Sequence, residues 1–92
     1  MQQVQINKKI YEVIENNQDC LDVELLNEKV TEYFDDFDYI FGDYFGDAVR
    51  LKGFNDSNNK KVKKINDIKF LEEYMKDYCG YGAKTFLLKK ID

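Results

Sequence analysis

Three aspartates, an arginine and a lysine lie close together near the middle of the chain. Asp38, Asp43 and Asp47 are followed directly by Arg50 and Lys52. Carboxylate oxygens suit hard cations such as Mg²⁺ and Ca²⁺, and a carboxyl with a raised pKa can act as a general acid or base. The spacing of these aspartates matches no calcium-binding loop, and no nucleophile lies beside them. A metal-dependent enzyme built on the Asp cluster is therefore the third-ranked hypothesis, and we assign no catalytic or metal-ligating residue.

The composition excludes several classes of catalytic site. The chain contains no histidine, so Ser–His and Cys–His nucleophile pairs and His-containing zinc sites cannot form. Two cysteines, Cys20 and Cys79, cannot complete a Cys-rich zinc site. Gly42, Gly46 and Gly53 do not form a phosphate-binding loop, since no helix begins at the required distance after them. These exclusions favour a non-catalytic protein without a cofactor.

The stretch that holds the Asp cluster alternates charged and large apolar side chains, as paired strands do. We predict strands over 38–44 and 48–54, joined by a turn at Gly46-Asp47. Depending on register, Arg50 would then meet Asp38, Asp43 or Tyr44 of the first strand. This predicts either a cross-strand ion pair or a binding platform on an open sheet face. The candidate partner-binding residues are Tyr39, Asp43, Tyr44, Arg50, Lys52 and Phe54.

The remaining elements follow from periodicity and capping signals. We predict an N-terminal hairpin that turns at Asn7-Lys8-Lys9. Asp22 would cap a helix that ends around 34–36, with Leu26, Val30 and Phe34 on its apolar face. Asn66 or Asp67 would cap a second helix. The predicted buried face of that helix is Ile68, Leu71, Met75 and Tyr78, and a final strand covers 83–91.

This element order, β-β-α-β-β-α-β, predicts the α+β class. The simplest architecture is a single, mostly antiparallel sheet of about five strands with two helices on one face. The other face would be at least partly open. The 92 residues form one domain, 1–92. Unpaired edge strands leave homodimerisation open.

Net charge is distributed unevenly. Residues 1–48 hold 3 cationic and 12 anionic side chains (net −9), whereas 49–92 hold 11 and 6 (net +5). The dense basic run is Lys60, Lys61, Lys63 and Lys64, which could neutralise phosphates while aromatic side chains stack on bases. RNA or ribosome association through this loop is the first alternative function, although a sequence pI of about 4.8 opposes attraction to nucleic acid.

Localisation follows from the cysteines and from the absence of targeting signals. Two cysteines without a signal peptide favour a reducing, cytoplasmic environment, in which a Cys20–Cys79 disulfide is not expected. No apolar run is long enough to span a membrane. We therefore expect a soluble cytoplasmic protein.

Several short segments resemble the YutD-like family of small bacterial proteins. The resemblance covers about 37–90 and rests on these segments: Asp38-Tyr39-Ile40, Gly42-Asp43, Arg50-Leu51-Lys52-Gly53-Phe54, Tyr78-Cys79, Gly82 and Phe86-Leu87-Leu88. The chain departs from the family pattern at Tyr44, where the pattern has Trp, and at Phe45, where it has Gly. These two departures point to a different turn. The resemblance implies a small α+β cytosolic protein of uncharacterised function and carries no activity with it.

The leading hypothesis is a non-catalytic cytosolic binding module. It would contact a protein or ribonucleoprotein partner through an open sheet face around Tyr39, Asp43, Tyr44, Arg50 and Lys52. The sequence does not identify that partner.

Overall fold

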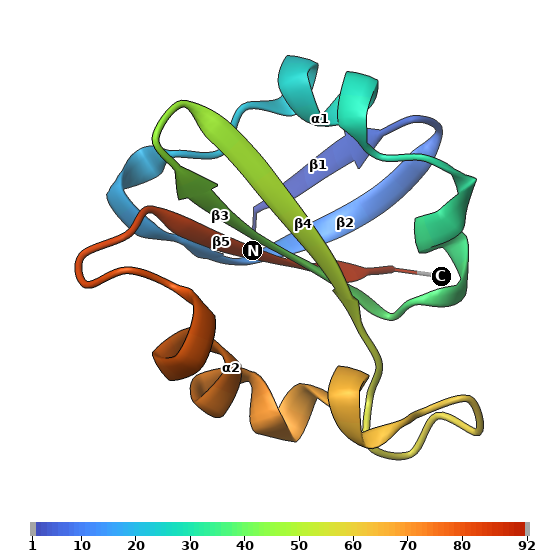
Figure 1. Cartoon of the computed structure of the whole chain (residues 1–92). Helices are drawn as coiled ribbons and strands as arrows, with labels where there is room; N and C mark the ends of the chain where they lie inside the picture. The colour runs from blue at the N-terminus through green and yellow to red at the C-terminus, as the bar shows by residue number, and fades with distance from the viewer. Residues whose placement is uncertain (1, 92) are drawn as a thin grey trace.

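The computed structural model describes residues 2–91 as one five-stranded sheet with helical segments on both sides (Figure 1). All four strand pairings are antiparallel, in the order β1-β2-β5-β3-β4. The α+β class and the element order β-β-α-β-β-α-β are confirmed. The strands are β1 (Gln3–Ile6), β2 (Lys9–Asn16), β3 (Tyr39–Phe45), β4 (Ala48–Phe54) and β5 (Thr85–Lys90).

The helical segments are short, and several are 3₁₀ turns. They are η1 (Asn17–Asp19), α1 (Val23–Lys29), η2 (Glu32–Asp36), η3 (Lys64–Asn66), η4 (Ile68–Phe70) and α2 (Leu71–Tyr78). Asp22 caps α1 as predicted, because its side chain accepts a hydrogen bond from the Leu25 amide at 3.1 Å. The predicted end of this helix is wrong: α1 stops at Lys29, and Thr31 caps the separate turn η2 that brings Phe34 into the core.

Both predicted hairpins are present. Asn7 and Lys8 turn the first hairpin with positive φ values of 51° and 76°. Gly46-Asp47 turns the second, which pairs Phe45 with Ala48 and Asp43 with Arg50. A two-residue turn therefore sets the register that decides which charged side chains meet.

The prediction that both helices lie on one face is wrong. Figure 1 shows α1 and α2 on opposite sides of the sheet. The cause lies in the central strands: Phe86 and Leu88 of β5 are buried on the α1 side, while Leu87 between them is buried on the α2 side. Side chains alternate along a strand, so three consecutive apolar residues need cover on both faces. A second helix on the α2 side supplies this cover.

Two glycines of the central hairpin allow aromatic rings to lie against the backbone on the α1 side. A Cβ atom at Gly42 would lie 2.1 Å from the Phe86 ring, and one at Gly53 would lie 2.4 Å from the Phe37 ring. Contacts this short are impossible for carbon atoms, so larger residues would displace these rings. This explains structurally why glycine stands at both positions.

The α2 side of the sheet is covered only in part. The small cluster under α2 includes residues of β3, β4 and β5, whereas Ile10 and Ile14 of β2 keep 45% and 42% of their surface exposed. The cysteines lie on opposite sides of the sheet: Cys20 packs against the α1-side cluster and Cys79 against the α2-side cluster, and both are free. No helix within residues 2–91 is long and apolar enough to cross a membrane.

Candidate partner-binding groove

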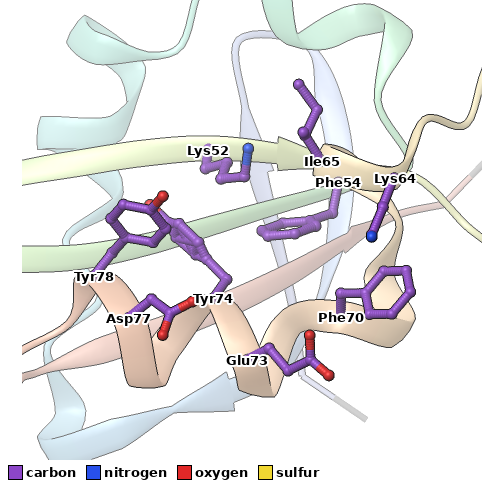
Figure 2. A pocket seen from close by; sticks show the side chains of 9 residues that line it. All are labelled: Lys52, Phe54, Lys64, Ile65, Phe70, Glu73, Tyr74, Asp77 and Tyr78. Carbon is purple, nitrogen blue, oxygen red and sulfur yellow. The ribbon is translucent and has the colours of Figure 1, made fainter.

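A groove lies between the edge strand β4 and helix α2 (Figure 2). Its volume of about 460 Å³ falls in the range of small ligand sites. The side chains that line it, which define the α2–β4 groove, are Lys52, Phe54, Lys64, Ile65, Phe70, Glu73, Tyr74, Asp77 and Tyr78. They come from three segments that are distant in sequence: the edge strand, the η3 turn and the η4–α2 helical run.

Tyr74 forms the aromatic wall of the groove on the helix side. Its ring lies edge-on to Phe41 and Phe54, with centroid distances of 5.9 and 5.7 Å, and stacks at a tilt on Tyr78 at 4.9 Å. The sequence analysis missed Tyr74 and placed Tyr78 on the buried face. Tyr78 is 65% exposed. The signal for Tyr74 was its position three residues after Leu71, which puts both on one helix face.

Lys52 lies over this aromatic surface. Its ammonium nitrogen is 5.2 Å from the centre of the Phe54 ring and 5.4 Å from that of Tyr74, both within cation–π range. No carboxylate of residues 2–91 lies within ion-pair distance of Lys52. Lys52 therefore makes no ion pair within the described residues, and the carboxylates of Glu73 and Asp77 line the same groove without pairing with it.

Arg50 bonds to Tyr78, one of the residues that line the groove. Its guanidinium makes a two-point ion pair with Asp43, in which Nε donates to Oδ1 at 3.2 Å and Nη2 donates to Oδ2. Nη2 also donates to the carbonyl oxygen of Tyr78 at 2.9 Å. Asp43 is only 1% exposed, and its hydrogen bonds raise the pKa of Arg50 above the usual value. The predicted cross-strand ion pair is present, and it also fastens the end of α2 to β4.

Cys79 lies beside this ion pair and is held as a neutral thiol. Burial, with a further contribution from the nearby Asp43 carboxylate, raises the pKa of Cys79 to about 11. Only a thiolate is a good nucleophile. This environment keeps Cys79 packed and unreactive at neutral pH.

The six predicted partner-binding residues do not share one open face. Asp43 and Phe54 are each only 1% exposed, so their side chains have little surface to offer a partner. Tyr44 lies on the α1 side, where its hydroxyl donates to the Cys20 carbonyl at 2.9 Å. Tyr39 is half-buried, with the Lys89 ammonium 5.9 Å from its ring centre. The expectation of a single platform is therefore wrong in its geometry, and of the six residues Lys52 and Phe54 line the α2–β4 groove.

The structure does not bring the aspartates together. Asp38 accepts hydrogen bonds from the Asp56 amide and the Asn59 side chain, each at 2.9 Å, whereas Asp43 pairs with Arg50. Asp47 lies exposed in the hairpin turn. Within the described residues 2–91, no three potential ligands group together to hold a metal ion. Each of the three aspartates thus has a separate structural setting.

The lysine run is divided between two surfaces. Lys64 lines the α2–β4 groove, whereas Lys60, Lys61 and Lys63 line a second depression of about 570 Å³ with the exposed ring of Tyr33. Lys61 lies 3.5 Å from a carboxylate oxygen of Asp36. Sequence reasoning did not anticipate this aromatic neighbour, because η2 brings Tyr33 to the loop through the fold.

Comparisons with known proteins place the chain in a family. Residues 5–89 match a family model described as "Putative antitoxin YutD-like". "Putative antitoxin YutD" of Bacillus subtilis (strain 168) is 35% identical over 81 residues, which cover 88% of this chain and 89% of that protein. The solution NMR structure of protein yutD from B. subtilis matches with a TM-score of 0.79 and 32% identity, covering 99% of this chain and 83% of that chain. With its fold, its motifs and most of its length in agreement, the chain belongs to the YutD-like family.

Proposed function

We propose that the protein is a non-catalytic binding module that acts as an antitoxin, binding a toxin protein through the α2–β4 groove. One observation carries this proposal. The two motif segments Arg50–Phe54 and Tyr78-Cys79, distant in sequence, meet at the groove and are joined by the bond from Arg50 to the Tyr78 carbonyl. The family description supplies the class of partner.

The chemistry of the groove supports recognition of a protein. Tyrosine and arginine dominate the binding energy of many protein interfaces, because they bury large surfaces and also offer hydrogen bonds. Here Tyr78 is 65% exposed and Ile65 is 75% exposed on either side of the cation Lys52. A partner that fills the groove would bury these apolar surfaces and pair with Lys52.

Affinity capture from the native cell, followed by mass spectrometry, tests this proposal. The double variant Lys52→Glu/Ile65→Asp reverses the charge and removes the apolar rim without touching buried residues. The double variant Lys8→Glu/Ile10→Asp makes the same chemical changes at the distant β1–β2 hairpin and serves as the control. We expect the groove variant to lose one captured protein that the control retains.

The captured protein must also behave as a toxin. Expressed alone in a host bacterium, it should arrest growth, and co-expression of the unaltered chain should restore growth while the groove variant should not. Capture that is equal for both double variants, or a captured protein without effect on growth, would contradict the proposal.

A second candidate is RNA binding at the depression formed by Tyr33, Lys60, Lys61 and Lys63. An exposed aromatic ring beside lysines favours it, because bases stack on such rings while cations neutralise phosphates. Binding of single-stranded oligouridine should then fall steeply between about 50 and about 200 mM salt, and Tyr33→Ala should weaken it. Absence of binding at about 50 mM salt would remove this candidate.

A further inference from the structure

The outer edge of β4 carries backbone groups that make no hydrogen bond within residues 2–91. The Tyr44 amide donates to the Lys84 carbonyl on the β5 side, so Tyr44 and its partner Val49 form a non-hydrogen-bonded pair. Opposite residues alternate between bonded and non-bonded pairs in antiparallel strands. Val49, Leu51 and Gly53 therefore turn their N–H and C=O groups away from β3, and no backbone or side-chain group of residues 2–91 bonds to them there.

This edge stops where the chain pairs with itself again. The Asn55 amide donates to the Asn66 carbonyl at 2.6 Å, and the Ile68 amide donates to the Asn55 carbonyl at 2.9 Å. The segment from η3 to η4 thus covers the edge beyond Gly53. The free part runs over 49–53, and the α2–β4 groove lies beside it, since Lys52 and Phe54 of the same strand line the groove.

We propose that the segment of the partner that binds here is an extended strand, which adds to β4 as a sixth strand of the sheet and places a carboxylate beside Lys52. This inference rests on the proposed function and specifies its partner. Strand addition is an established mode of peptide recognition, in which backbone hydrogen bonds give affinity and pockets for alternate side chains give specificity. Here the alternate side chains would enter the groove between β4 and α2.

The charges of β4 argue against a second copy of this chain as the added strand. Residues on one face of an antiparallel pair stand directly opposite each other, and like charges there destabilise the pair. In the symmetric register that uses all three outward-facing residues (49, 51 and 53), Arg50 of each copy would stand opposite Lys52 of the other. Charged side chains on edge strands are a common device against self-association.

The same charges select a complementary strand. On the α2 side, a residue opposite Lys52 would be acidic, because Lys52 has no ion-pair partner within residues 2–91. On the α1 side, Val49 and Leu51 are half-buried against the larger core cluster, so the facing residues would be apolar. The expected segment therefore alternates acidic and apolar residues.

Two synthetic probes test the inference by NMR on the ¹⁵N-labelled full chain. One is a capped eight-residue peptide of alternating Val and Glu, and the other is its Val–Lys counterpart. We expect saturable shifts at Val49, Leu51 and Gly53 with the Val–Glu peptide, slower amide exchange at these residues, and about tenfold weaker binding of the Val–Lys peptide. Equal binding of both peptides, no saturable binding, or shifts centred on other residues would overturn the inference.

A proline on the edge separates backbone pairing from side-chain contact. Val49→Pro removes an outward N–H, which an edge strand tolerates because this group makes no bond within the sheet. Val49→Ala loses similar packing but keeps the N–H. We expect Val49→Pro, with its fold verified by NMR, not to bind the Val–Glu peptide, whereas Val49→Ala should still bind it. Binding that survives Val49→Pro would overturn the inference.

The partner captured from the native cell distinguishes this inference from the proposed function. Loss of that partner in both Lys52→Glu/Ile65→Asp and Val49→Pro supports strand addition. Loss in the groove variant alone refutes strand addition and leaves the proposed function standing, whereas loss in neither refutes both. A dimer in sedimentation equilibrium that Val49→Pro abolishes would also refute the inference, because a second copy would then occupy the edge.

Discussion

The two sides of the sheet differ in how completely they are closed. On the α1 side, eight residues form a buried cluster: Ile6, Tyr11, Leu26, Val30, Phe34, Ile40, Phe86 and Leu88. On the α2 side, the buried hydrophobic cluster within residues 2–91 consists of Phe41, Phe54 and Leu87, and half-buried residues surround it. Apolar area removed from water is the main source of folding free energy. The α1 side therefore carries most of the stability.

The polar groups of the two sides differ as well. The α2 side holds the Asp43–Arg50 ion pair and the Lys52 cation over two aromatic rings. On the α1 side, the Tyr44 hydroxyl donates a hydrogen bond to the Cys20 carbonyl and so has its partner inside the fold. A small core beside cations and exposed rings suits recognition, because a partner can bury what the fold leaves open. The α1 side thus holds most of the buried apolar core, whereas the α2 side leaves aromatic and cationic side chains exposed.

Removal of a large side chain from the α1-side core should cause the largest loss of folding stability, and the matching removal on the α2 side should cost less. Phe86→Ala empties the α1-side core, where Phe86 is fully buried, and should cost about 3–5 kcal/mol. The melting temperature should then fall by about 15 °C or more. Tyr74→Ala on the α2 side should cost clearly less, since Tyr74 is only half-buried. Equal losses in thermal unfolding followed by circular dichroism would contradict the comparison.

Overpacking the α1-side core should cause the next largest loss of folding stability. Gly42→Ala drives a methyl group into the Phe86 ring and should cost about 1–3 kcal/mol. Gly80→Ala is the matched control, because a Cβ atom at Gly80 meets nothing within 4 Å. Urea unfolding of both variants measures the difference, and a Gly42→Ala chain as stable as the control would show that the ring moves freely.

Breaking the ion pair tests the link between β4 and α2. Arg50→Ala leaves the buried Asp43 carboxylate without its partner and frees the Tyr78 carbonyl, so stability should fall. In the double variant Asp43→Asn/Arg50→Ala no unpaired charge is buried, and most of the loss should be recovered. Thermal melting checks this. A double variant less stable than Arg50→Ala would indicate that packing, and not charge, holds the pair in place.

Reversal of the groove cation should hardly affect stability. Lys52→Glu gives up cation–π contacts with Phe54 and Tyr74, which are worth about 0.5–1 kcal/mol at exposed sites. The melting temperature should therefore fall by less than about 8 °C, while the captured partner is lost. A collapse of the fold on this substitution would assign Lys52 to the architecture instead of to binding.

Ionisation of the Cys79 thiol should have the smallest effect on folding stability, and at neutral pH it should have none. Because the pKa of this thiol is raised in the folded chain to about 11, its contribution to stability is complete below the unfolded value of about 8.5 and is lost as pH rises through about 11. In a Cys20→Ser background, iodoacetamide at about pH 8 should modify Cys79 about 100-fold more slowly than the urea-unfolded chain. Rapid modification of the folded chain at that pH would contradict the assigned environment.

Both hairpin turns and the start of the first helix could be predicted from the sequence, because each has a local signal. Asn7-Lys8, Gly46-Asp47 and the Asp22 cap all act within a few residues. The end of α1 and the start of α2 could not: Asp67 caps the separate turn η4, and α2 begins at Leu71.

The arrangement of the helices was predicted incorrectly. The three consecutive apolar residues Phe86-Leu87-Leu88 are buried on alternating faces of the sheet. Such a run is the sequence signal for a central strand that is covered on both faces.

The candidate site could be predicted only in part. The Asp43–Arg50 pair was one of the predicted cross-strand partners, because a hairpin register offers few alternatives. The groove joins β4 to α2 through residues far apart in sequence, so periodicity alone cannot show that Tyr74 lies under Lys52. The burial of Phe54 likewise depends on where α2 packs.

Site-specific photo-crosslinking in the native cell tests the central claim most directly. A photoreactive phenylalanine analogue would replace Ile65 at the groove, Ile10 on the uncovered part of the sheet, or Tyr81, which is fully exposed beyond α2. We predict one crosslinked protein adduct from position 65 and none of the same mass shift from positions 10 and 81. An adduct formed from position 10 or 81 and not from 65 would contradict the assignment of binding to the α2–β4 groove.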